Sequence, residues 1–231
     1  MKSRSPRPRH ASAPRRKAGR AAAGKRAGRP AKANTRRRSV EIIEAAAQVF
    51  AERGYHGATT QDIADILHIR QASLYYYVPS KEAALELVCI QGVAGFFETA
   101  QAVAAGPGTA RERLSGLIRA HMAPILDRGN FVRVFLTQRQ FLPNRSRRRV
   151  GKWSRGLEKI FETVIRDGMR RGEFRADLDP RLATLAILGL ANAVAAWYGK
   201  EDASIERIGG EFVSLVLDGL GQAGKRVRRN R

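Results

Sequence analysis

The chain has 231 residues, of which 43% are hydrophobic, so it can bury a core in one or two domains. Its formal net charge of +22 indicates a polyanionic partner. The single cysteine, Cys89, excludes a disulfide framework and a cysteine-based metal site. No apolar run approaches the ~18–20 residues of a membrane span, and no signal-peptide core is present, so we expect a cytoplasmic protein without a membrane partner.

The excess charge is concentrated in residues 1–38, which hold 15 Lys or Arg and no Asp or Glu. This Pro-, Gly- and Ala-rich segment has no apolar periodicity and is predicted to be a disordered basic arm. Its stretch Lys25–Pro30 resembles the Gly-Arg-Pro core of an AT-hook, in which an arginine enters the minor groove of A·T-rich DNA. We favour the alternative of a solvated arm that adds non-specific affinity through counterion release.

From Ser39 onward the pattern predicts an all-α chain, because β-branched alternation is absent and the breaks fall at Gly, Pro and capping residues. Thr109 and Glu112 have the spacing of a capping box, and Pro180 suits a first helical position. Pro124 should kink the helix that contains it. The predicted helices span residues 39–53, 60–67, 71–77, 81–104, 109–127, 130–142, 145–171, 180–199 and 203–221.

Residues 39–81 are predicted to form a three-helix helix-turn-helix DNA-binding domain. The first helix carries an apolar stripe over Ile42–Phe50, and Gly54 ends it at a position that favours a left-handed backbone. Leu74 of the third helix faces inward, which leaves the rest of that helix free to enter the major groove.

Candidate DNA contacts follow from this arrangement. Thr59 and Thr60 open the second helix, where Thr59 and Asp62 have the spacing of a capping box and free backbone N–H groups suit a DNA phosphate. Ser80 caps the next helix and places Lys81 to meet a phosphate. The candidates to face the major groove are Arg70, Gln71, Ala72, Ser73, Tyr75 and Tyr76.

The segment from Arg38 to Val88 resembles the amino-terminal domain of the TetR family of bacterial transcriptional regulators. It carries three short motifs at the family's spacing: Ile63-Ala64, Leu74-Tyr75 and Ser80-Lys81-Glu82. The resemblance implies a homodimer, a recognition helix at about 71–77 and a ligand-sensing carboxy-terminal domain. The chain departs from the family pattern at three positions that bear on turn geometry and base preference: His68, Arg70 and Val78.

Residues 82–222 are expected to form the helical ligand-sensing and dimerisation domain, followed by a basic tail at 223–231. Most apolar residues of this domain are expected to be core, and the kink at Pro124 can open space between helices. The candidate apolar contacts to a ligand are Phe96, Phe97, Met122, Phe131, Phe135 and Trp153.

A run of cations begins the seventh predicted helix and is either a solvated basic face or an anchor for an anionic ligand, with Arg148 and Lys152 as the candidates. The segments Gly172–Pro180, Leu188–Asn192 and Trp197-Tyr198 loosely resemble TetR-family members that sense fatty-acyl or steroid-derived acyl-CoA. This resemblance implies a small-molecule effector that is an acyl-CoA or another hydrophobic anion.

The last two predicted helices carry small and apolar residues that allow close approach of helix pairs, so we assign them to a two-fold four-helix homodimer interface. Dimerisation would set the two recognition helices about 34–36 Å apart, so the operator should be an imperfect palindrome. The interface candidates are Ala183, Ala186, Ile187, Gly189, Leu190, Ala193, Val194, Ile205, Ile208, Phe212, Leu215 and Val216.

The sequence therefore predicts a ligand-responsive regulator of double-stranded DNA, and the resemblance implies a repressor released from a palindromic operator. The alternative is an architectural, nucleoid-type protein that uses its basic arm. An enzyme is not supported, because the four histidines have no metal-ligand spacing and no Gly-x-Ser-x-Gly or P-loop motif occurs. We expect no catalytic residue, metal or cofactor.

Overall fold

The computed structural model describes residues 28–220, which divide into two units between Arg36 and Arg37. Residues 1–27, with most of the predicted basic arm, and the predicted tail at 223–231 lie outside the described residues. Within 28–220 all regular elements are helical: α1 (Gly28–Gly57), α2 (Thr60–Ile66), α3 (Gln71–Tyr75), α4 (Lys81–Ala105), α5 (Ala110–Met122), α6 (Pro124–Asp127), α7 (Gly129–Gln138), the 3₁₀ helix η1 (Arg139–Phe141), α8 (Asn144–Arg170), α9 (Pro180–Trp197) and α10 (Ile205–Leu220).

Helix α1 begins at Gly28 rather than near residue 39, so the expectation of disorder was wrong for residues 28–38. Pro30 lies in the first turn, where its missing N–H is tolerated, and the Ala and Arg residues that follow are good helix formers. Arg37 and Glu41 add an ion pair of 3.1 Å at the i,i+4 spacing.

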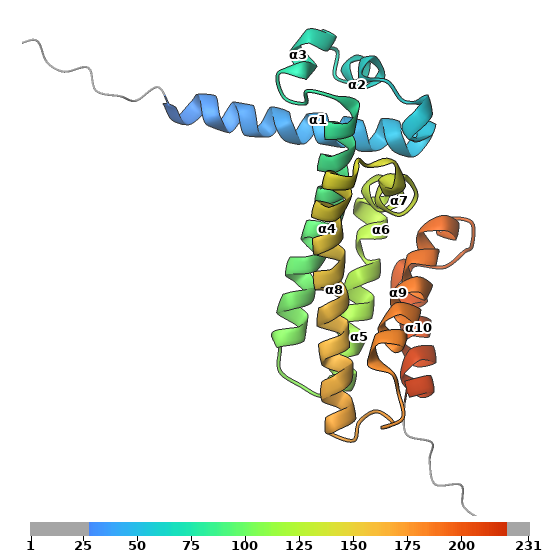
Figure 1. Ribbon diagram of the computed structural model, residues 1–231. Helices are drawn as coiled ribbons and strands as arrows, with labels where there is room; N and C mark the ends of the chain where they lie inside the picture. Colours follow the sequence, from blue (N-terminus) through green and yellow to red (C-terminus); the bar gives the residue numbers. More distant parts are fainter. Residues whose placement is uncertain (1–27, 221–231) are drawn as a thin grey trace, which may run out of the picture. The chain divides into compact units, whose positions relative to one another are not determined.

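The part of the second unit formed by α1 from Arg37, α2 and α3 is the head, which is drawn in blue to teal in Figure 1. Its core buries Phe50 of α1, Ile63 of α2 and Leu74 of α3 in one cluster with the first turns of α4. Gly54 has a φ of 68°, as its predicted position at the end of the first helix requires, and one further helical turn follows it. α3 ends at Tyr75, two residues earlier than predicted.

The turn between α2 and α3 contains His68 with a φ of 51°. A histidine in the left-handed region is strained relative to glycine. The departure from the family pattern at His68 therefore places backbone strain in this turn. The turn is held by the backbone N–H groups of His68 and Ile69, which donate to the carbonyls of Asp65 and Ala64 at 3.1 and 3.0 Å.

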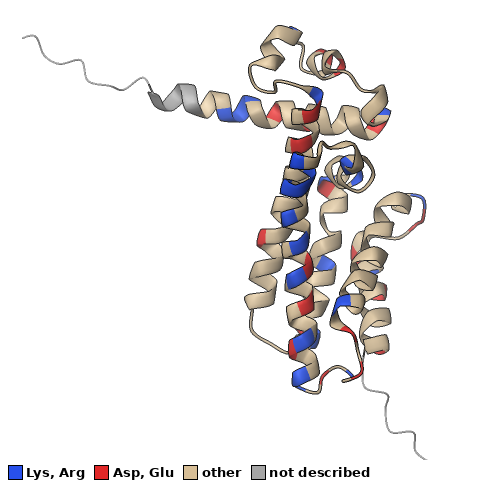
Figure 2. Cartoon of the chain, in the orientation of Figure 1, with Lys and Arg blue, Asp and Glu red and all other residues tan. Residues whose placement is uncertain are grey.

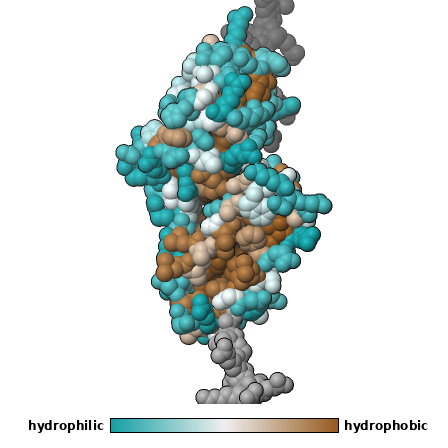
Figure 3. Space-filling view, turned by 90° about the vertical axis from the view of Figure 1, so that its right-hand side faces the viewer, coloured by the Kyte–Doolittle hydropathy of each residue, from teal (hydrophilic) through white to brown (hydrophobic). Residues whose placement is uncertain are grey.

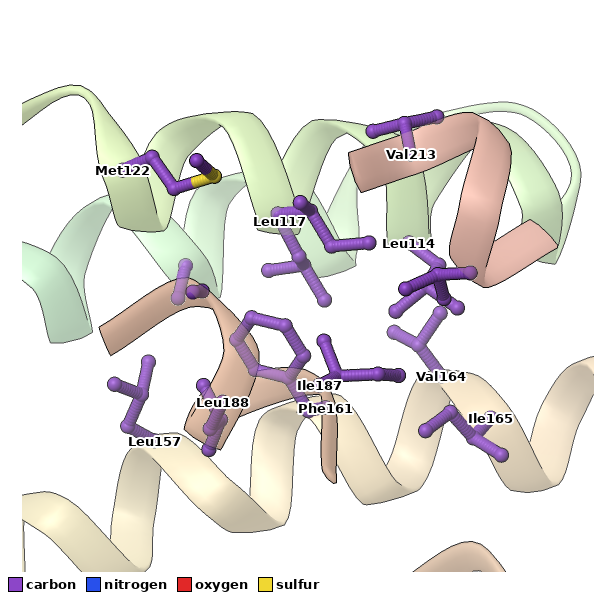
Figure 4. Packing of buried hydrophobic residues seen from close by; sticks show 14 of the residues in the cluster. Leu114, Leu117, Met122, Leu157, Phe161, Val164, Ile165, Ile187, Leu188 and Val213 are labelled. Carbon is purple, nitrogen blue, oxygen red and sulfur yellow. The ribbon is translucent and has the colours of Figure 1, made fainter. Parts of the chain in front are cut away.

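Helices α4 to α10 form a bundle, hereafter the regulatory domain (Figure 1). α4 packs along α8, α5 contacts α4, α8 and α10, and α9 lies against α8. Its core surrounds Phe161, near which Ile187 and Leu188 of α9 and Leu117 of α5 converge (Figure 4). Apolar stripes on each helix therefore meet at one interior.

Two predicted helices are each divided in the structure. The helix expected at 109–127 breaks at Ala123, immediately before Pro124, because proline cannot donate to the helical ladder of α5. The helix expected at 130–142 ends as α7 at Gln138 and continues as the 3₁₀ helix η1. The capping box of Thr109 and Glu112 is present at the start of α5.

Two helices contradict the expectation that no segment is apolar enough for a membrane span. By length and composition, α4 and α9 are both long and apolar enough to cross a membrane. Both are nevertheless packed in the regulatory domain, α4 against α5, α7 and α8, and α9 against α5, α7 and α8. Their composition fits this packing, since bundle helices also present apolar faces.

Candidate functional site

The outer face of α3 is polar and accessible. Arg70 caps the helix with its backbone extended, and Ala72, Ser73 and Tyr76 are exposed, with Tyr76 at 80%. Leu74 is buried and anchors the helix to the head core, as predicted. α3 itself contains no Lys or Arg, so Arg70 at its N-cap supplies the nearby positive charge.

A small hydrogen-bond network joins α3 to the start of α2. Gln71 Nε2 donates to Thr60 Oγ1 at 2.7 Å, and the Thr60 and Tyr75 hydroxyls lie 3.1 Å apart. These three side chains, all expected to contact DNA, therefore also fix the recognition helix against α2. The network holds the exposed residues of α3 in one orientation.

The first turn of α2 has the predicted capping box. The backbone N–H of Thr59 donates to Asp62 Oδ2 at 2.7 Å, and the backbone N–H of Asp62 donates to Thr59 Oγ1 at 3.1 Å. Hydrogen bonds from the Thr59 hydroxyl and backbone, with the nearby Arg53 guanidinium, lower the pKa of Asp62. Thr59 is therefore hydrogen-bonded to Asp62 within the head.

The Lys81 side chain is hydrogen-bonded within the head. Its ammonium donates to the carbonyls of Tyr55 and Ala58 at 2.9 and 3.0 Å and lies 4.4 Å from the centre of the Tyr55 ring. The Tyr55 hydroxyl donates to Glu82 Oε1 at 2.6 Å, and burial with this carboxylate raises the pKa of Tyr55 to about 12. These contacts close the connection from α1 to α2, and the expected phosphate contact by Lys81 stays a prediction.

The α7–η1 segment connects the regulatory domain to the head at the end of α1, where Tyr55 and His56 lie. The backbone N–H of Tyr55 donates to Gln138 Oε1 at 2.9 Å. The ring of Phe141 stacks on Tyr55 with centres 5.6 Å apart and meets His56 edge-on at 4.5 Å. No sequence pattern predicts this joint, because its partners lie far apart along the chain.

A cavity of about 230 Å³ lies inside the regulatory domain. Its lining is mainly apolar and comes from α4, α5, α7, α8 and α9, with Arg139 from η1 and Ile125 from α6. The lining residues are Gly92, Val93, Phe96, His121, Ile125, Val132, Phe135, Leu136, Arg139, Ser154, Leu157, Glu158, Leu185, Leu188, Gly189, Ala191 and Asn192.

Of the predicted apolar ligand contacts, Phe96 and Phe135 line this cavity and the other four do not. Met122 is 1% exposed and packs in the core of the domain. Phe97 packs edge-on against Trp153, with ring centres 5.4 Å apart. The Phe131 ring lies under the Arg128 guanidinium and packs against the buried cluster that contains Phe50 and Leu74.

The predicted anion anchors are also outside the cavity lining, because Arg148 and Lys152 lie on the exposed face of α8, whose length is marked by basic residues in Figure 2. The cation that lines the cavity is Arg139, whose guanidinium lies 4.7 Å from the centre of the Phe135 ring. The carboxylate in the lining, Glu158, is paired with Arg181 at 2.6 Å.

Three polar groups inside the cavity wall were not predicted. The His121 Nε2–H donates to Asn192 Oδ1 at 2.9 Å, while His121 Nδ1 and Ser154 Oγ are buried without a hydrogen-bond partner. Burial lowers the pKa of His121, and the hydrogen bond to Asn192 opposes this shift only in part. The imidazole is therefore neutral near pH 7.

An apolar surface covers α9 and α10 on the side shown in Figure 3. We call it the α9–α10 surface, and its exposed leucines include Leu182 at 64% and Leu215 at 65%. Leu190 and Ala186 extend the same surface. Part of the predicted interface faces inward instead, since five of its members are buried in the bundle itself: Ile187, Val194, Ile205, Ile208 and Val216.

Comparisons with known proteins match both halves of the chain. Residues 42–88 match the model for bacterial regulatory proteins of the tetR family, and residues 107–220 match that for the tetracyclin repressor-like C-terminal domain. The HTH-type transcriptional repressor KstR2 of Rhodococcus jostii is 25% identical over 79% of this chain and 91% of its own length.

Two solved structures have a similar fold. A TetR/AcrR family regulator from Thermobifida fusca is 30% identical, with a TM-score of 0.64 over 80% of this chain and all of that one. The regulator FadR from Bacillus subtilis in complex with stearoyl-CoA is 23% identical, with a TM-score of 0.68 over 78% of this chain and 98% of that one.

Proposed function

This chain belongs to the TetR family of bacterial transcriptional regulators, and from that membership we propose that it is a dimeric repressor released from operator DNA when a ligand fills the regulatory-domain cavity. The observation that carries the proposal is that one segment, α7 with η1, both lines the cavity and holds the head. Phe135 and Arg139 belong to the cavity lining, whereas Gln138 and Phe141 bind the corner at Tyr55.

This shared segment supplies a physical route from ligand to DNA. A ligand that pushes on Phe135 or Arg139 would move α7–η1, and Gln138 and Phe141 would then transmit the displacement to Tyr55 at the end of α1. A ligand with higher affinity for the displaced arrangement shifts the population towards heads that no longer match the operator. The coupling is reciprocal, so operator DNA should also weaken ligand binding.

On the DNA side, we assign reading of the major groove to the exposed residues of α3 and its cap, which are Arg70, Ala72, Ser73 and Tyr76. The network of Thr60, Gln71 and Tyr75 supports them by fixing α3 on α2, and Thr59 adjoins the same surface. Arg70 is suited to guanine because its guanidinium can donate to both major-groove acceptors of that base.

The proposed effector has a short apolar body and an anionic group. The body fits a lining that includes Phe96 and Phe135, and a volume of about 230 Å³ lies below the ~300–1,000 Å³ typical of drug-sized ligands. Arg139 at the edge of this lining is the cation suited to the anionic group, in place of Arg148 and Lys152. A short-chain acyl-CoA meets both requirements, and the likeness to the stearoyl-CoA-bound regulator supports an acyl-CoA, although the stearoyl chain is longer than the chain proposed for this cavity.

Dimerisation through the α9–α10 surface completes the proposal, because Leu182, Leu190 and Leu215 would be buried between two copies. Two heads about 34–36 Å apart then bind a palindrome, in the cytoplasm where the bacterial chromosome lies. The architectural alternative is not favoured, because it gives no role to a regulatory domain that matches a tetR-type family along residues 107–220.

The proposal is tested with the full chain and an operator recovered by selection from random duplex DNA. Operator affinity is measured by fluorescence anisotropy with acyl-CoAs of increasing chain length and with free coenzyme A. We expect a short-chain acyl-CoA to release the DNA and coenzyme A alone to leave it bound. Arg139→Ala should weaken this release, whereas the control Arg148→Ala on the exposed face of α8 should not. An operator affinity that no acyl-CoA alters would refute the proposed effector class.

A further inference from the structure

The cavity contains two buried polar atoms that the protein leaves unsatisfied, His121 Nδ1 and Ser154 Oγ. A buried polar group without a hydrogen bond costs stability, so such atoms are rare and mark sites where another molecule supplies the bond. Both residues line the same cavity of about 230 Å³, so a small adjustment of its wall would let one ligand meet both atoms.

The hydrogen-bond partner of His121 fixes what its free nitrogen can do. Because Nε2–H donates to Asn192 Oδ1, Nε2 carries the ring proton. Burial keeps the ring neutral, as its lowered pKa indicates, so Nδ1 presents a bare lone pair. Nδ1 therefore needs a donor from the ligand.

Ser154 complements this requirement. A serine hydroxyl both donates and accepts, so it can pair with the acceptor side of the same ligand group. Around these two atoms the cavity is apolar, with Phe96 5.3 Å from the His121 ring centre to centre and Leu157 and Leu188 in the lining. A hydrocarbon would leave both polar atoms unpaired, and a ketone or ester oxygen would leave Nδ1 unpaired.

We infer that the cavity selects ligands that carry a hydroxyl on an apolar body, with the hydroxyl donating to His121 Nδ1 and accepting from Ser154 Oγ. This inference rests on the proposed function, since it takes the cavity as the effector site and specifies which apolar body enters it. A 3-hydroxyacyl group or a cyclic alcohol has the required chemistry, whereas the saturated parent does not.

The test compares three probes of nearly equal size, cyclooctanol, its methyl ether and cyclooctanone, with the full chain and no DNA. Isothermal calorimetry gives the affinities, and ¹⁵N NMR of the imidazole identifies the site. We expect cyclooctanol to bind about tenfold more tightly than either analogue, as one or two well-paired neutral hydrogen bonds allow. It should also shift the resonance of His121 Nδ1 while Nε2 remains protonated.

Two variants separate recognition from folding. Ser154→Ala removes one hydroxyl from a helix that tolerates alanine, and it should weaken all three probes alike, because each has an oxygen that can accept from Ser154 Oγ, while the preference for the alcohol persists. His121→Phe should abolish the preference. Equal affinities for the three probes, or an unperturbed His121 Nδ1, would overturn the inference. These measurements contain no DNA, so they do not depend on the proposed repressor mechanism. In a separate anisotropy titration with operator DNA, cyclooctanol that binds without releasing the operator would contradict only that mechanism.

Discussion

Two leucines on the α9–α10 surface provide the sharpest test of how the protein dimerises. Leu182 lies in the first turn of α9 and Leu215 lies within α10, and both border one apolar groove. We predict that the double variant Leu182→Glu/Leu215→Glu is a folded monomer. Glutamate is a good helix former, and neither leucine is buried in the bundle, so the fold of the single chain should survive.

The expected loss of dimer affinity follows from the exposed fraction of the two leucine side chains. Burying a whole leucine side chain contributes about 1.5–3 kcal/mol, so the roughly two-thirds that is exposed contributes about 1–2 kcal/mol. A two-fold interface contains each leucine twice, which gives about 4–8 kcal/mol for the four side chains. At about 1.4 kcal/mol per tenfold, the dimer dissociation constant should rise by a factor of at least about 10³, before charge repulsion is added.

Sedimentation equilibrium over a range of concentrations measures this change, and circular dichroism checks the helix content. The matched control is Leu126→Glu on α6, which removes a leucine of similar exposure, 49%, outside the α9–α10 surface. The control should remain a dimer. A double variant that stays dimeric at the concentrations where the wild type does would refute the assignment of the interface.

Three further predictions concern the head, the joint and the core. Tyr76→Ala should lower operator affinity in anisotropy titrations, while the free energy of unfolding changes by less than about 0.5 kcal/mol because the ring is exposed; unchanged affinity would remove it from the DNA contact. Phe141→Ala removes the stack on Tyr55 and should reduce the ligand-induced loss of operator affinity by about fivefold, as expected for a pair of about 1 kcal/mol; full coupling would exclude this route. Asp167→Asn should lower the melting temperature at pH 7, because the hydrogen bond from Arg113 lowers the pKa of Asp167 below its ordinary 3.8. A carboxyl with a lowered pKa stabilises the fold above its unfolded pKa and loses this effect as pH falls through the folded value, so the two melting curves should converge in that range.

Local chemistry explains what the sequence could predict. The capping boxes at Thr59 and Thr109 need partners only three residues away, so their spacing alone indicates them. The break at Pro124 and the positive φ of Gly54 depend on the covalent structure of single residues. The inward position of Leu74 follows from helical periodicity.

Features that depend on packing between distant helices could not be predicted in this way. Whether Arg148 reaches the cavity depends on which face of α8 turns inward, and whether Arg139 does depends on how η1 packs against α4 and α7. The pair of His121 with Asn192 joins α5 to α9, and the bond of Tyr55 to Gln138 joins α1 to α7. No local pattern marks either residue of such a pair before the helices are placed.

The central claim is that a dimer of this chain binds a specific operator and releases it when a ligand binds. Selection from random duplex DNA at physiological salt, with the wild type and the Leu182→Glu/Leu215→Glu variant side by side, tests it most directly. The account predicts that the wild type recovers an imperfect palindrome whose half-sites lie about one DNA turn apart, and that the variant does not. Recovery of only A·T-rich or random DNA by the wild type would contradict the account and point to architectural binding.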